Sequence, residues 1–430
     1  MNFINTSAFP AFHDFVQISS NLNKPLYTAI HIKTGKKVLI SIIPKSSILA
    51  ESKRKHVFAA IEVLSKLDHP FIADFYGTCE DKENLYILTE YLVNGNLIDI
   101  VSSGKKLRDN DIQKVFCQIA SAIKYLHCIK NIVHRDLQLK NIHFDEDYNV
   151  RISDFGLSKA LENEEEFLKT QCGYIPFLAP EIIKGRPYSK PVDIWALGII
   201  LYALSFNSMP FYDNSLVIVA QKIINAEPEY PTTLNHDQLV LIQKLLNKDP
   251  ISRIVVDDIL SNQWVMNSRY SYYLTDTFIN SAKYSSNEPP DQQACQIILE
   301  GGYDIEQVKN DLQNNNNSES LMVYKMIRKS QIVSLLTSSD EIRNMYSMKK
   351  GDGMRRLSGN LVRSGRQTIH ARVQPSISNK VNTVRQPILE DLVLERDISV
   401  PNTRPSIAPV RRNSLPRQRA PQNTSWGNNY

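Results

Sequence analysis

The chain has 430 residues, which is enough for two or three domains around one large core. Its net charge is +5, but residues 330–430 carry 16 Lys and Arg against 7 Asp and Glu, so the basic character belongs to the tail. The five cysteines form no C-x-x-C pair and no cluster with histidine at zinc spacing, so we expect a protein of a reducing, cytoplasmic compartment without disulfides or structural zinc. No apolar run is long enough to span a bilayer, so we also expect no membrane span.

The first third of the chain predicts a small antiparallel sheet with one helix. Residues 12–45 contain the strand patterns F-V-Q-I, L-Y-T-A-I-H-I and V-L-I-S-I-I, and a K-T-G-K turn joins the last two. Residues 51–67 predict a helix, and residues 71–90 predict two more strands. Residues 109–128 then begin a helical region, because their apolar side chains repeat at helical spacing and form a core stripe.

The central stretch, residues 132–157, carries the chemistry. Two short apolar runs flank a turn rich in Asp and Asn, which predicts a small hairpin. The hairpin would bring together three oxygen-bearing side chains, Asp136, Asn141 and Asp154. Carboxylate and amide oxygens are ligands that Mg²⁺ prefers, usually with phosphates completing its coordination.

The spacing of these residues resembles that of the protein kinases. H-R-D, an Asn five residues after the Asp, and D-F-G together resemble the catalytic and metal-binding loops of that family, and the resemblance extends over residues 12–264. It implies an α+β, bilobal kinase fold over residues 12–266, with a small β-rich N-terminal lobe (N-lobe) and a large helical C-terminal lobe (C-lobe). It also implies that Asp136 accepts the proton of a protein hydroxyl, while Asn141 and Asp154 hold Mg²⁺ on ATP.

The N-lobe departs from the family at the phosphate-binding positions. The three glycines of the family's first loop fall on Ser19, Asn21 and Lys24, and glycine is needed there because a Cβ would keep the backbone away from the phosphates. V-A-I-K becomes V-L-I-S, so Ser41 replaces the phosphate-binding lysine. The helix glutamate that pairs with this lysine falls on Ala60, and we interpret the pair as lost together, because a buried carboxylate without its cation is costly.

The expected adenine slot is also altered. Leu39 replaces a small alanine on its roof, and Leu26 replaces a valine there. His143 replaces an aliphatic residue on the floor. These changes predict a narrowed or filled slot, although His143 stacking on a base is the alternative. The resemblance places the gate and hinge of the slot at three further residues: Thr89, Glu90 and Leu92.

A second pair of losses affects the catalytic loop. The lysine two residues after Asp136 is Gln138, and its usual Ser or Thr partner in C-G-[ST] is Tyr174. Both changes act where the γ-phosphate would lie, and losing one such electrostatic contact commonly reduces the rate about 10²–10³-fold. Asn96 stands where related kinases often carry a glutamate that contacts ribose or a substrate arginine.

Other family positions are retained. Thr170 matches the activation-loop site of kinases related to the AMP-activated kinase, where an upstream kinase would add a phosphate. Arg135 matches the arginine that would pair with that phosphate. The remaining matches are architectural: the buried ion pair Glu181–Arg253, the loop-binding Asp193, and the hydrophobic column of Leu64, Phe75, His134 and Phe155.

The chain beyond this domain divides into three parts. Residues 267–290 predict a linker, and residues 291–330 contain three short helical stretches that resemble the ubiquitin-associated-like domain of AMP-activated-kinase relatives. We expect this domain to dock on its own kinase domain in preference to ubiquitin. Residues 331–430 predict a disordered tail with two basic phosphorylation-type motifs, at Ser358 and at Ser414, the latter fitting an adaptor of the 14-3-3 kind. No aromatic interleaving in this basic tail supports nucleic-acid binding.

These patterns support three functional hypotheses. The first is a pseudokinase, or a very weak serine/threonine kinase, that acts as a signalling scaffold or allosteric partner. The second is an active kinase in which Lys24 replaces the strand lysine, as a loop lysine does in the with-no-lysine kinases; those kinases, however, keep the loop glycines and the helix glutamate. The third is weak binding of metal–nucleotide through Asn141 and Asp154 without turnover.

Overall fold

A computed structural model describes residues 4–19, 25–163, 165–231, 234–281, 290–314, 316, 318–334 and 336. Asn21 and Lys24 lie outside these ranges, and so do the tail residues Ser358 and Ser414.

The N-lobe is built on one antiparallel sheet with strand order β1-β2-β3-β5-β4. Its strands are β1 (Phe12–Ser19), β2 (Leu26–His31), β3 (Lys37–Pro44), β4 (Phe75–Glu80) and β5 (Asn84–Glu90), and its helix is α1 (Glu51–Ser65). Side chains alternate between the two faces of a strand, so the fully buried Val38, Ile40 and Ile42 of β3 share one face. Leu39 and Ser41 therefore share the opposite face.

The C-lobe is mainly helical, with short strands around the central stretch. Its helices are α2 (Leu97–Ser102), α3 (Asp109–Lys124), α4 (Pro180–Ile183), α5 (Pro191–Phe206), α6 (Leu216–Asn225), α7 (His236–Leu245), α8 (Gln263–Met266) and α9 (Asp276–Ser281). Its strands are β6 (Ile132–Val133), β7 (Ile142–Phe144), β8 (Val150–Ile152) and β9 (Lys159–Ala160). The two longest helices supply much of the core: α3 buries the predicted apolar stripe, and α5 is apolar all round and buried from Val192 to Leu204.

The first part of the expected linker belongs to the C-lobe core. Residues 271–274 form a 3₁₀ turn that is followed by α9, and Tyr273, Leu274 and Ile279 are almost completely buried. The ring of Tyr273 lies 5.0 Å from that of Phe71 in an edge-to-face arrangement. The polar composition of this segment suggested a linker, but its tyrosines bury large apolar rings in the C-lobe core.

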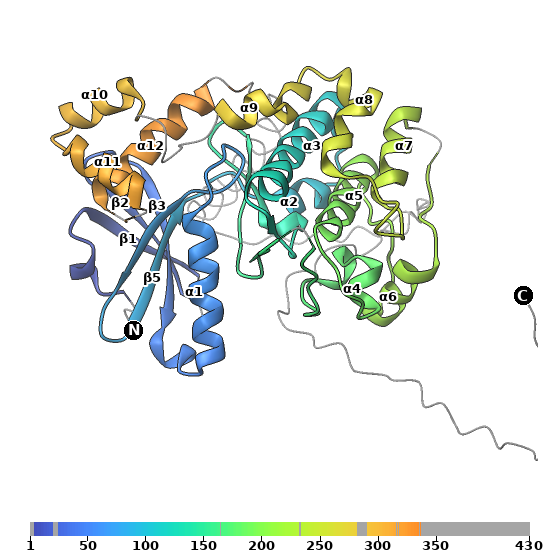
Figure 1. The fold of residues 1–430 in the computed structure, drawn as a ribbon, viewed down its shortest axis with the longest axis horizontal. Coiled ribbons are helices and arrows are strands. Elements are labelled where there is room, and N and C mark those ends of the chain that lie inside the picture. The colour runs from blue at the N-terminus through green and yellow to red at the C-terminus, as the bar shows by residue number, and fades with distance from the viewer. Residues whose placement is uncertain are drawn as a thin grey trace, which may run out of the picture. The chain divides into compact units, whose positions relative to one another are not determined.

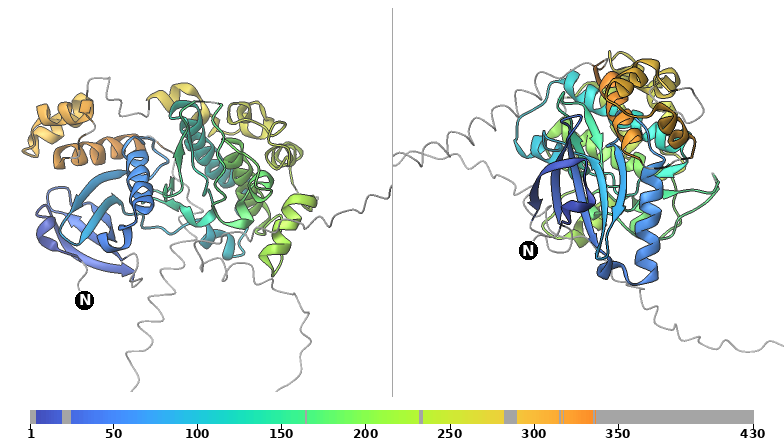
Figure 2. Two further views of the ribbon diagram at one scale, coloured as in Figure 1. Left: turned by 60° about the horizontal axis from the view of Figure 1, so that its bottom comes forward. Right: turned by 90° about the vertical axis from the view of Figure 1, so that its left-hand side faces the viewer.

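Three helices follow as predicted: α10 (Gln292–Glu300), α11 (Ile305–Asn314) and α12 (Glu319–Ser334). They form one hydrophobic cluster with the buried face of the N-lobe sheet, in which Ile298, Val308 and Met326 join Val38 and Ile40. Figures 1 and 2 show α12 beside the N-lobe strands in every view. No helix within the described ranges is both long and apolar enough to cross a membrane.

Candidate active site

The predicted hairpin is present and holds the central residues together. Strands β7 and β8 pair antiparallel with Ile142 opposite Ile152. The amide nitrogen of Asn141 donates to the backbone carbonyl and to the Oδ2 of Asp136, both at 2.9 Å. The amide nitrogen of Gln138 donates to the other oxygen of Asp136, Oδ1, at 2.6 Å. Both oxygens of the candidate base thus accept hydrogen bonds from neutral amides.

Burial dominates the electrostatics of Asp136. Burial raises the pKa of this carboxyl, and the charge of Asp154 raises it further. His134, the hydrogen bond from Asn141 and the charge of Lys140 oppose the shift but do not cancel it. Asp136 therefore holds a proton more readily than an ordinary aspartate does.

The residues around Asp136 fit a magnesium ion. Because the amide nitrogen of Asn141 faces Asp136, its side-chain oxygen remains the atom suited to a cation. Asp154 has a backbone φ of 61°, in the left-handed region that is uncommon for residues other than glycine, and such strain is often found at functional sites. Among the described residues no group of three or more His, Cys, Asp or Glu is arranged for a metal. An ion here would therefore depend on phosphate oxygens to complete its coordination.

The roof residues lie side by side on the sheet. Ser41 pairs with Leu26 of β2 and with Ile87 of β5. Leu39 pairs with Thr89, the expected gate residue. The face of β3 opposite Val38 and Ile40 therefore presents a leucine and a serine, and neither side chain carries a positive charge.

The floor and hinge positions lie where the hairpin meets β5. His143 is on β7, and burial lowers its pKa, so the imidazole is neutral at physiological pH. Leu92 is the second residue after β5 and is half-buried. Glu90, at the end of β5, has its carboxylate held by Arg151 and Lys329, two cations that our sequence analysis did not place in the site.

Helix α1 supplies no carboxylate in place of the glutamate expected at position 60. The side chain of Ala60 is a single methyl group, and Glu62 pairs with Lys66 at 2.7 Å on the solvent side of the helix. Asn96 has a structural use: its side chain caps α2 and forms a reciprocal capping box with Asp99.

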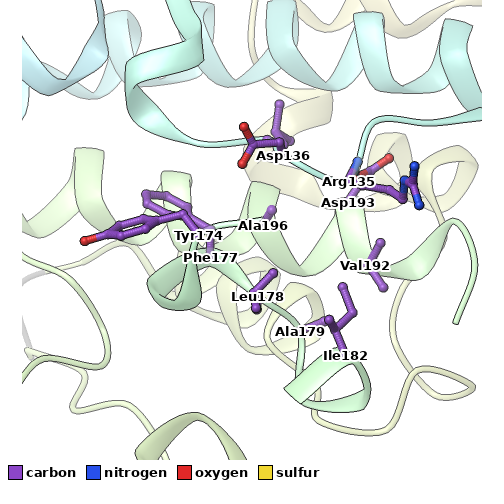
Figure 3. A pocket seen from close by; sticks show the side chains of 11 residues that line it. Arg135, Asp136, Tyr174, Phe177, Leu178, Ala179, Ile182, Val192, Asp193 and Ala196 are labelled. Atoms are coloured by element: carbon purple, nitrogen blue, oxygen red, sulfur yellow. Dashed lines mark hydrogen bonds between the residues drawn. The ribbon is translucent and has the colours of Figure 1, made fainter. Parts of the chain in front are cut away.

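A small pocket lies between the catalytic loop and the segment that contains Tyr174. Figure 3 shows Asp136 on one side of it and Phe177, Leu178 and Ala196 on the other. The hydroxyl of Tyr174 lies on the side of its ring that faces away from Asp136. The tyrosine therefore does not take over the hydroxyl position of the expected Ser or Thr.

The framework of the catalytic loop is complete. Asp193 accepts hydrogen bonds from the backbone N–H groups of His134 at 2.8 Å and Arg135 at 2.9 Å, and from His127 Nε2 at 2.9 Å. Arg253 and Glu181 form a buried two-bond pair at 2.7 and 3.0 Å. The Asp193 hydrogen bonds hold the backbone of the catalytic loop, and the Glu181–Arg253 pair joins α4 to the loop after α7.

Replacing Asp193 with asparagine should destabilise the protein by about 2–3 kcal/mol at pH 7, because one carboxylate oxygen becomes a donor that faces other donors. Burial alone would raise the pKa of Asp193, but the hydrogen bond and charge of His127, with the contributions of His134, lower it. A carboxyl whose pKa is depressed in the folded state stabilises above its unfolded pKa of about 3.9 and loses that contribution as the pH falls through the folded value. Urea unfolding of D193N and the parent should therefore give a gap that narrows below about pH 4; a gap independent of pH would contradict this account.

Arg135 is connected to the activation segment through Tyr188. The Tyr188 hydroxyl lies 3.5 Å from a guanidinium nitrogen of Arg135 and donates to the backbone carbonyl of Thr170 at 2.5 Å. The side chain of Thr170 is exposed. Arg135 also donates to the carbonyl of Leu157, so it joins both ends of the segment.

This combination of a five-stranded N-lobe, a helical C-lobe and the H-R-D and D-F-G loops defines a protein kinase fold. The family model for the protein kinase domain matches residues 25–265, and the chain belongs to that family. Within it, the chain is similar to an SNF1-related protein kinase catalytic subunit alpha (KIN12) from Arabidopsis thaliana, with 34% identity over 304 residues. It is also similar to the NUAK family SNF1-like kinase 1 of Homo sapiens, with 38% identity over 257 residues, and to the serine/threonine-protein kinase SIK2 of Gallus gallus, with 30% over 319.

The predicted relationship to AMP-activated-kinase relatives is confirmed by these similarities. The matches cover 70%, 58% and 73% of this chain for KIN12, NUAK and SIK2, in that order. They cover 60%, 38% and 40% of the respective relatives, so the chain spans less than two thirds of the length of each.

Proposed function

We propose that the chain is a pseudokinase, or a very weak serine/threonine kinase, that acts as a signalling scaffold or allosteric partner. The observation that carries this proposal is the loss of both phosphate-directed lysines from otherwise ordered positions. Ser41 lies on the slot face of β3, and the amide of Gln138 is bonded to Asp136 at 2.6 Å.

The energetic consequence is large because the two losses act on the same phosphates. An ATP triphosphate carries several negative charges, and the nearby side chains of Asp136 and Asp154 add two more when ionised. Each missing contact is worth about 10²–10³ in rate, so the two together place phosphotransfer below ordinary detection. The Leu39 side chain beside Thr89 adds bulk where adenine would lie.

The retained features suit a binding role. Asp193 and the Glu181–Arg253 pair keep the C-lobe surface ordered without ligand. Thr170 remains exposed and is connected to Arg135 through Tyr188, so an upstream kinase could still modify it and change the activation segment. A 14-3-3-type adaptor at Ser414 and modification of Ser358 remain predictions.

The three helices α10–α12 support the expected intramolecular role. Their apolar residues share a core with the N-lobe sheet, and Lys33 of the N-lobe lies 3.8 Å from the centre of the Tyr303 ring. We infer that this ubiquitin-associated-like segment serves its own kinase domain in preference to ubiquitin, because the surface it buries there is unavailable to another protein.

The test is a phosphotransfer assay on Thr170-phosphorylated protein with Mg-ATP and a generic protein substrate. We expect no turnover above that of the D136A variant. Turnover that D136A abolishes would overturn the proposal. Calorimetry with Mg-ADP separates weak structural binding through Asn141 and Asp154, which gives heat without turnover, from an empty slot, which gives none.

The second candidate is an active kinase that uses Lys24. One observation favours this candidate: Leu26 of β2 pairs with Ser41 of β3, and Lys24 precedes Leu26 by two residues in the sequence. If this candidate holds, K24A should abolish the thermal shift that Mg-ATP produces, whereas K33A should leave it unchanged. A nucleotide-induced shift that K24A leaves intact would exclude it.

A further inference from the structure

The loop between α4 and α5 attaches the activation segment to the C-lobe at Tyr188. The N–H of Tyr188 donates to the carbonyl of Leu168 at 2.9 Å, and its carbonyl accepts from the N–H of Leu168 at 2.8 Å. The Tyr188 hydroxyl donates to the carbonyl of Thr170 at 2.5 Å. These three hydrogen bonds all use backbone atoms of the activation segment, so they require no particular side chain at position 170.

Burial fixes Tyr188 in this position. Tyr188 is 3% exposed and Leu168 is 8% exposed, and both belong to the main hydrophobic core. Burial raises the pKa of the Tyr188 hydroxyl to about 12, the neighbouring Cys172 acts in the same direction, and Arg135 opposes them. The hydroxyl therefore keeps its proton at physiological pH and remains a donor to the Thr170 carbonyl.

The same hydroxyl is joined to the catalytic loop by Arg135. A terminal nitrogen of the guanidinium lies 3.5 Å from the Tyr188 hydroxyl, and the Nε donates to the carbonyl of Leu157 at 2.5 Å. The backbone of Arg135 is fixed in turn, since its N–H donates to Asp193 at 2.9 Å. A hydroxyl that accepts from a cation becomes a stronger donor, because hydrogen bonds in a chain polarise one another. Arg135, Tyr188 and the Thr170 carbonyl therefore act as one chain of hydrogen bonds.

A second attachment lies one residue beyond Thr170. The side-chain amide of Gln171 donates to the carbonyl of Ile182, in α4, at 2.9 Å. The side chain of Thr170 is exposed, and it takes part in neither attachment. The backbone around Thr170 is thus held in place while its hydroxyl stays accessible to a modifying enzyme.

The position of Tyr188 matters for what a phosphate on Thr170 would do. Phosphorylation orders a segment when the added phosphate pairs with an arginine. Here Arg135, the arginine expected to form that pair, already has a neutral partner in the Tyr188 hydroxyl. Charge-assisted hydrogen bonds are about twice as strong as neutral ones, so a phosphate on Thr170 would compete with this hydroxyl for the guanidinium.

We propose that Tyr188 is a positioning residue that holds the activation segment on the C-lobe without phosphorylation of Thr170, with its hydroxyl on the guanidinium that a phosphate would otherwise bind. Phosphorylation then changes the partner of Arg135 and does not order the segment. This role needs neither nucleotide nor turnover, so it applies to a scaffold and to a weak kinase alike. It goes beyond the function proposed above, and either proposal can fail without the other.

The test is hydrogen exchange on the full chain without nucleotide, in a T170A background that cannot be phosphorylated at this position. We expect residues 167–172 of T170A to exchange at least tenfold more slowly than in the urea-unfolded chain. In T170A/Y188F their exchange should rise at least fivefold, while the α5 peptides stay protected. T170A/Y202F is the matched control, because the Tyr202 hydroxyl also donates to a backbone carbonyl, that of Glu229 at 2.6 Å, outside the activation segment.

Two results of this experiment would overturn the proposal. One is equal exchange of residues 167–172 in T170A and T170A/Y188F. The other is exchange of these residues in T170A as fast as in the unfolded chain, which would mean that the unmodified segment is not held at all. The second result is measured on a chain that keeps Tyr188, so it stands whatever the stability of the Y188F variants.

A phosphorylation readout separates a positioning role from a loss of packing. In Y188F the Arg135 guanidinium loses its hydroxyl partner, so phosphorylating Thr170 should bring the exchange of residues 167–172 back to within twofold of the parent. In the parent, the same phosphorylation should change this exchange less than twofold. If phosphorylation leaves Y188F exchanging as fast as T170A/Y188F, or slows exchange in the parent tenfold, then Tyr188 does not take the place of the phosphate and the proposal fails.

Discussion

Restoring the four missing side chains as S41K/A60E/Q138K/Y174T should produce measurable Mg-ATP-dependent phosphotransfer. The lysine at position 41 would lie on the slot face of β3 and needs the glutamate at 60 as its partner, because a buried lone cation is unfavourable. The lysine at position 138 would replace the amide now 2.6 Å from Asp136, and its charge would lower the raised pKa of that carboxyl. Each restored contact is expected to contribute about 10²–10³ in rate. The measurement is incorporation of labelled phosphate into a generic protein substrate.

Partial variants separate the two restored pairs. S41K/A60E alone should restore nucleotide binding by calorimetry with little turnover, whereas Q138K/Y174T alone should do neither. The same four changes with D136A serve as the control for contaminating kinase. If the fourfold variant binds Mg-ADP no better than the parent, then the leucines on the roof and the missing loop glycines block the slot, and the lost lysines are not the deciding change.

Replacing Arg253 with methionine should destabilise the protein by about 3–5 kcal/mol, because it leaves the Glu181 carboxylate buried without its cation. Glu181 is 4% exposed and Arg253 is 3% exposed, so water cannot take over the lost hydrogen bonds. The guanidinium also donates to the carbonyl oxygens of Pro191 and Asn247, which would lose a donor. Since the free energy of unfolding of a whole domain is only about 5–15 kcal/mol, R253M should unfold at a much lower urea concentration than the parent.

The double variant E181M/R253M tests the cause. It removes both charges, and well-packed apolar pairs often replace buried ion pairs with little loss of stability. We therefore expect its urea midpoint to lie much closer to that of the parent than the midpoint of R253M does. K55A provides the surface comparison, because Lys55 pairs with Glu51 while both side chains are more than three quarters exposed, and its midpoint should not change. Equal midpoints for R253M and K55A would refute the assigned importance of the buried pair.

Local patterns predicted the elements around the site well. The strands of the N-lobe, the β7–β8 hairpin, α3 and the helices α10–α12 follow from apolar periodicity, which is a property of neighbouring residues. The contact between Asn141 and Asp136 follows from the five-residue spacing within one loop. The family resemblance predicted Leu39 and Thr89 as separate positions of the slot, and the strand register of the structure places them opposite each other.

Patterns that depend on distant partners were harder to interpret. Arg151 stands in the middle of an apolar strand, and that position could have signalled a buried charge, but nothing in the sequence indicated its partners. Lys329 lies on a helix in a region with many charges and carries no signal of burial. Tyr273, in a polar segment, was expected to be in a linker and instead packs on Phe71.

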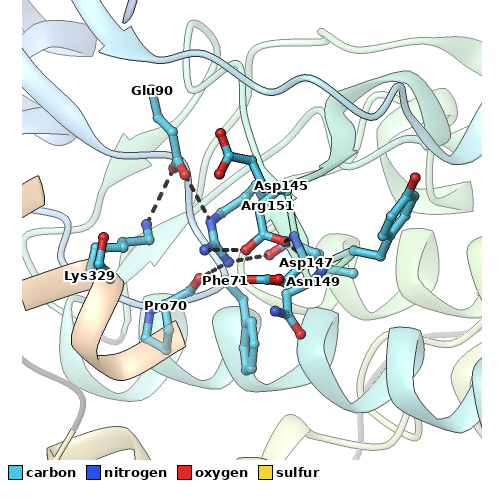
Figure 4. Close-up of polar contacts among 12 residues, drawn as sticks. Pro70, Phe71, Glu90, Asp145, Asp147, Asn149, Arg151 and Lys329 are labelled. Atoms are coloured by element: carbon cyan, nitrogen blue, oxygen red, sulfur yellow. Dashed lines mark hydrogen bonds and ion pairs between the residues drawn. The ribbon is translucent and has the colours of Figure 1, made fainter. Parts of the chain in front are cut away.

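Residue identity and short-range spacing were enough to predict the kinase fold and the grouping of Asp136, Asn141 and Asp154, and they led to the prediction that both phosphate-directed lysines are lost. Only the folded structure showed what surrounds these residues. It showed that Gln138 is bonded to Asp136, that residues 267–281 complete the C-lobe, and that Lys329 reaches Glu90 from a position 239 residues further along the chain (Figure 4). The physical reason is that buried charges are stabilised by partners brought together by folding, and their distance along the chain leaves no local pattern.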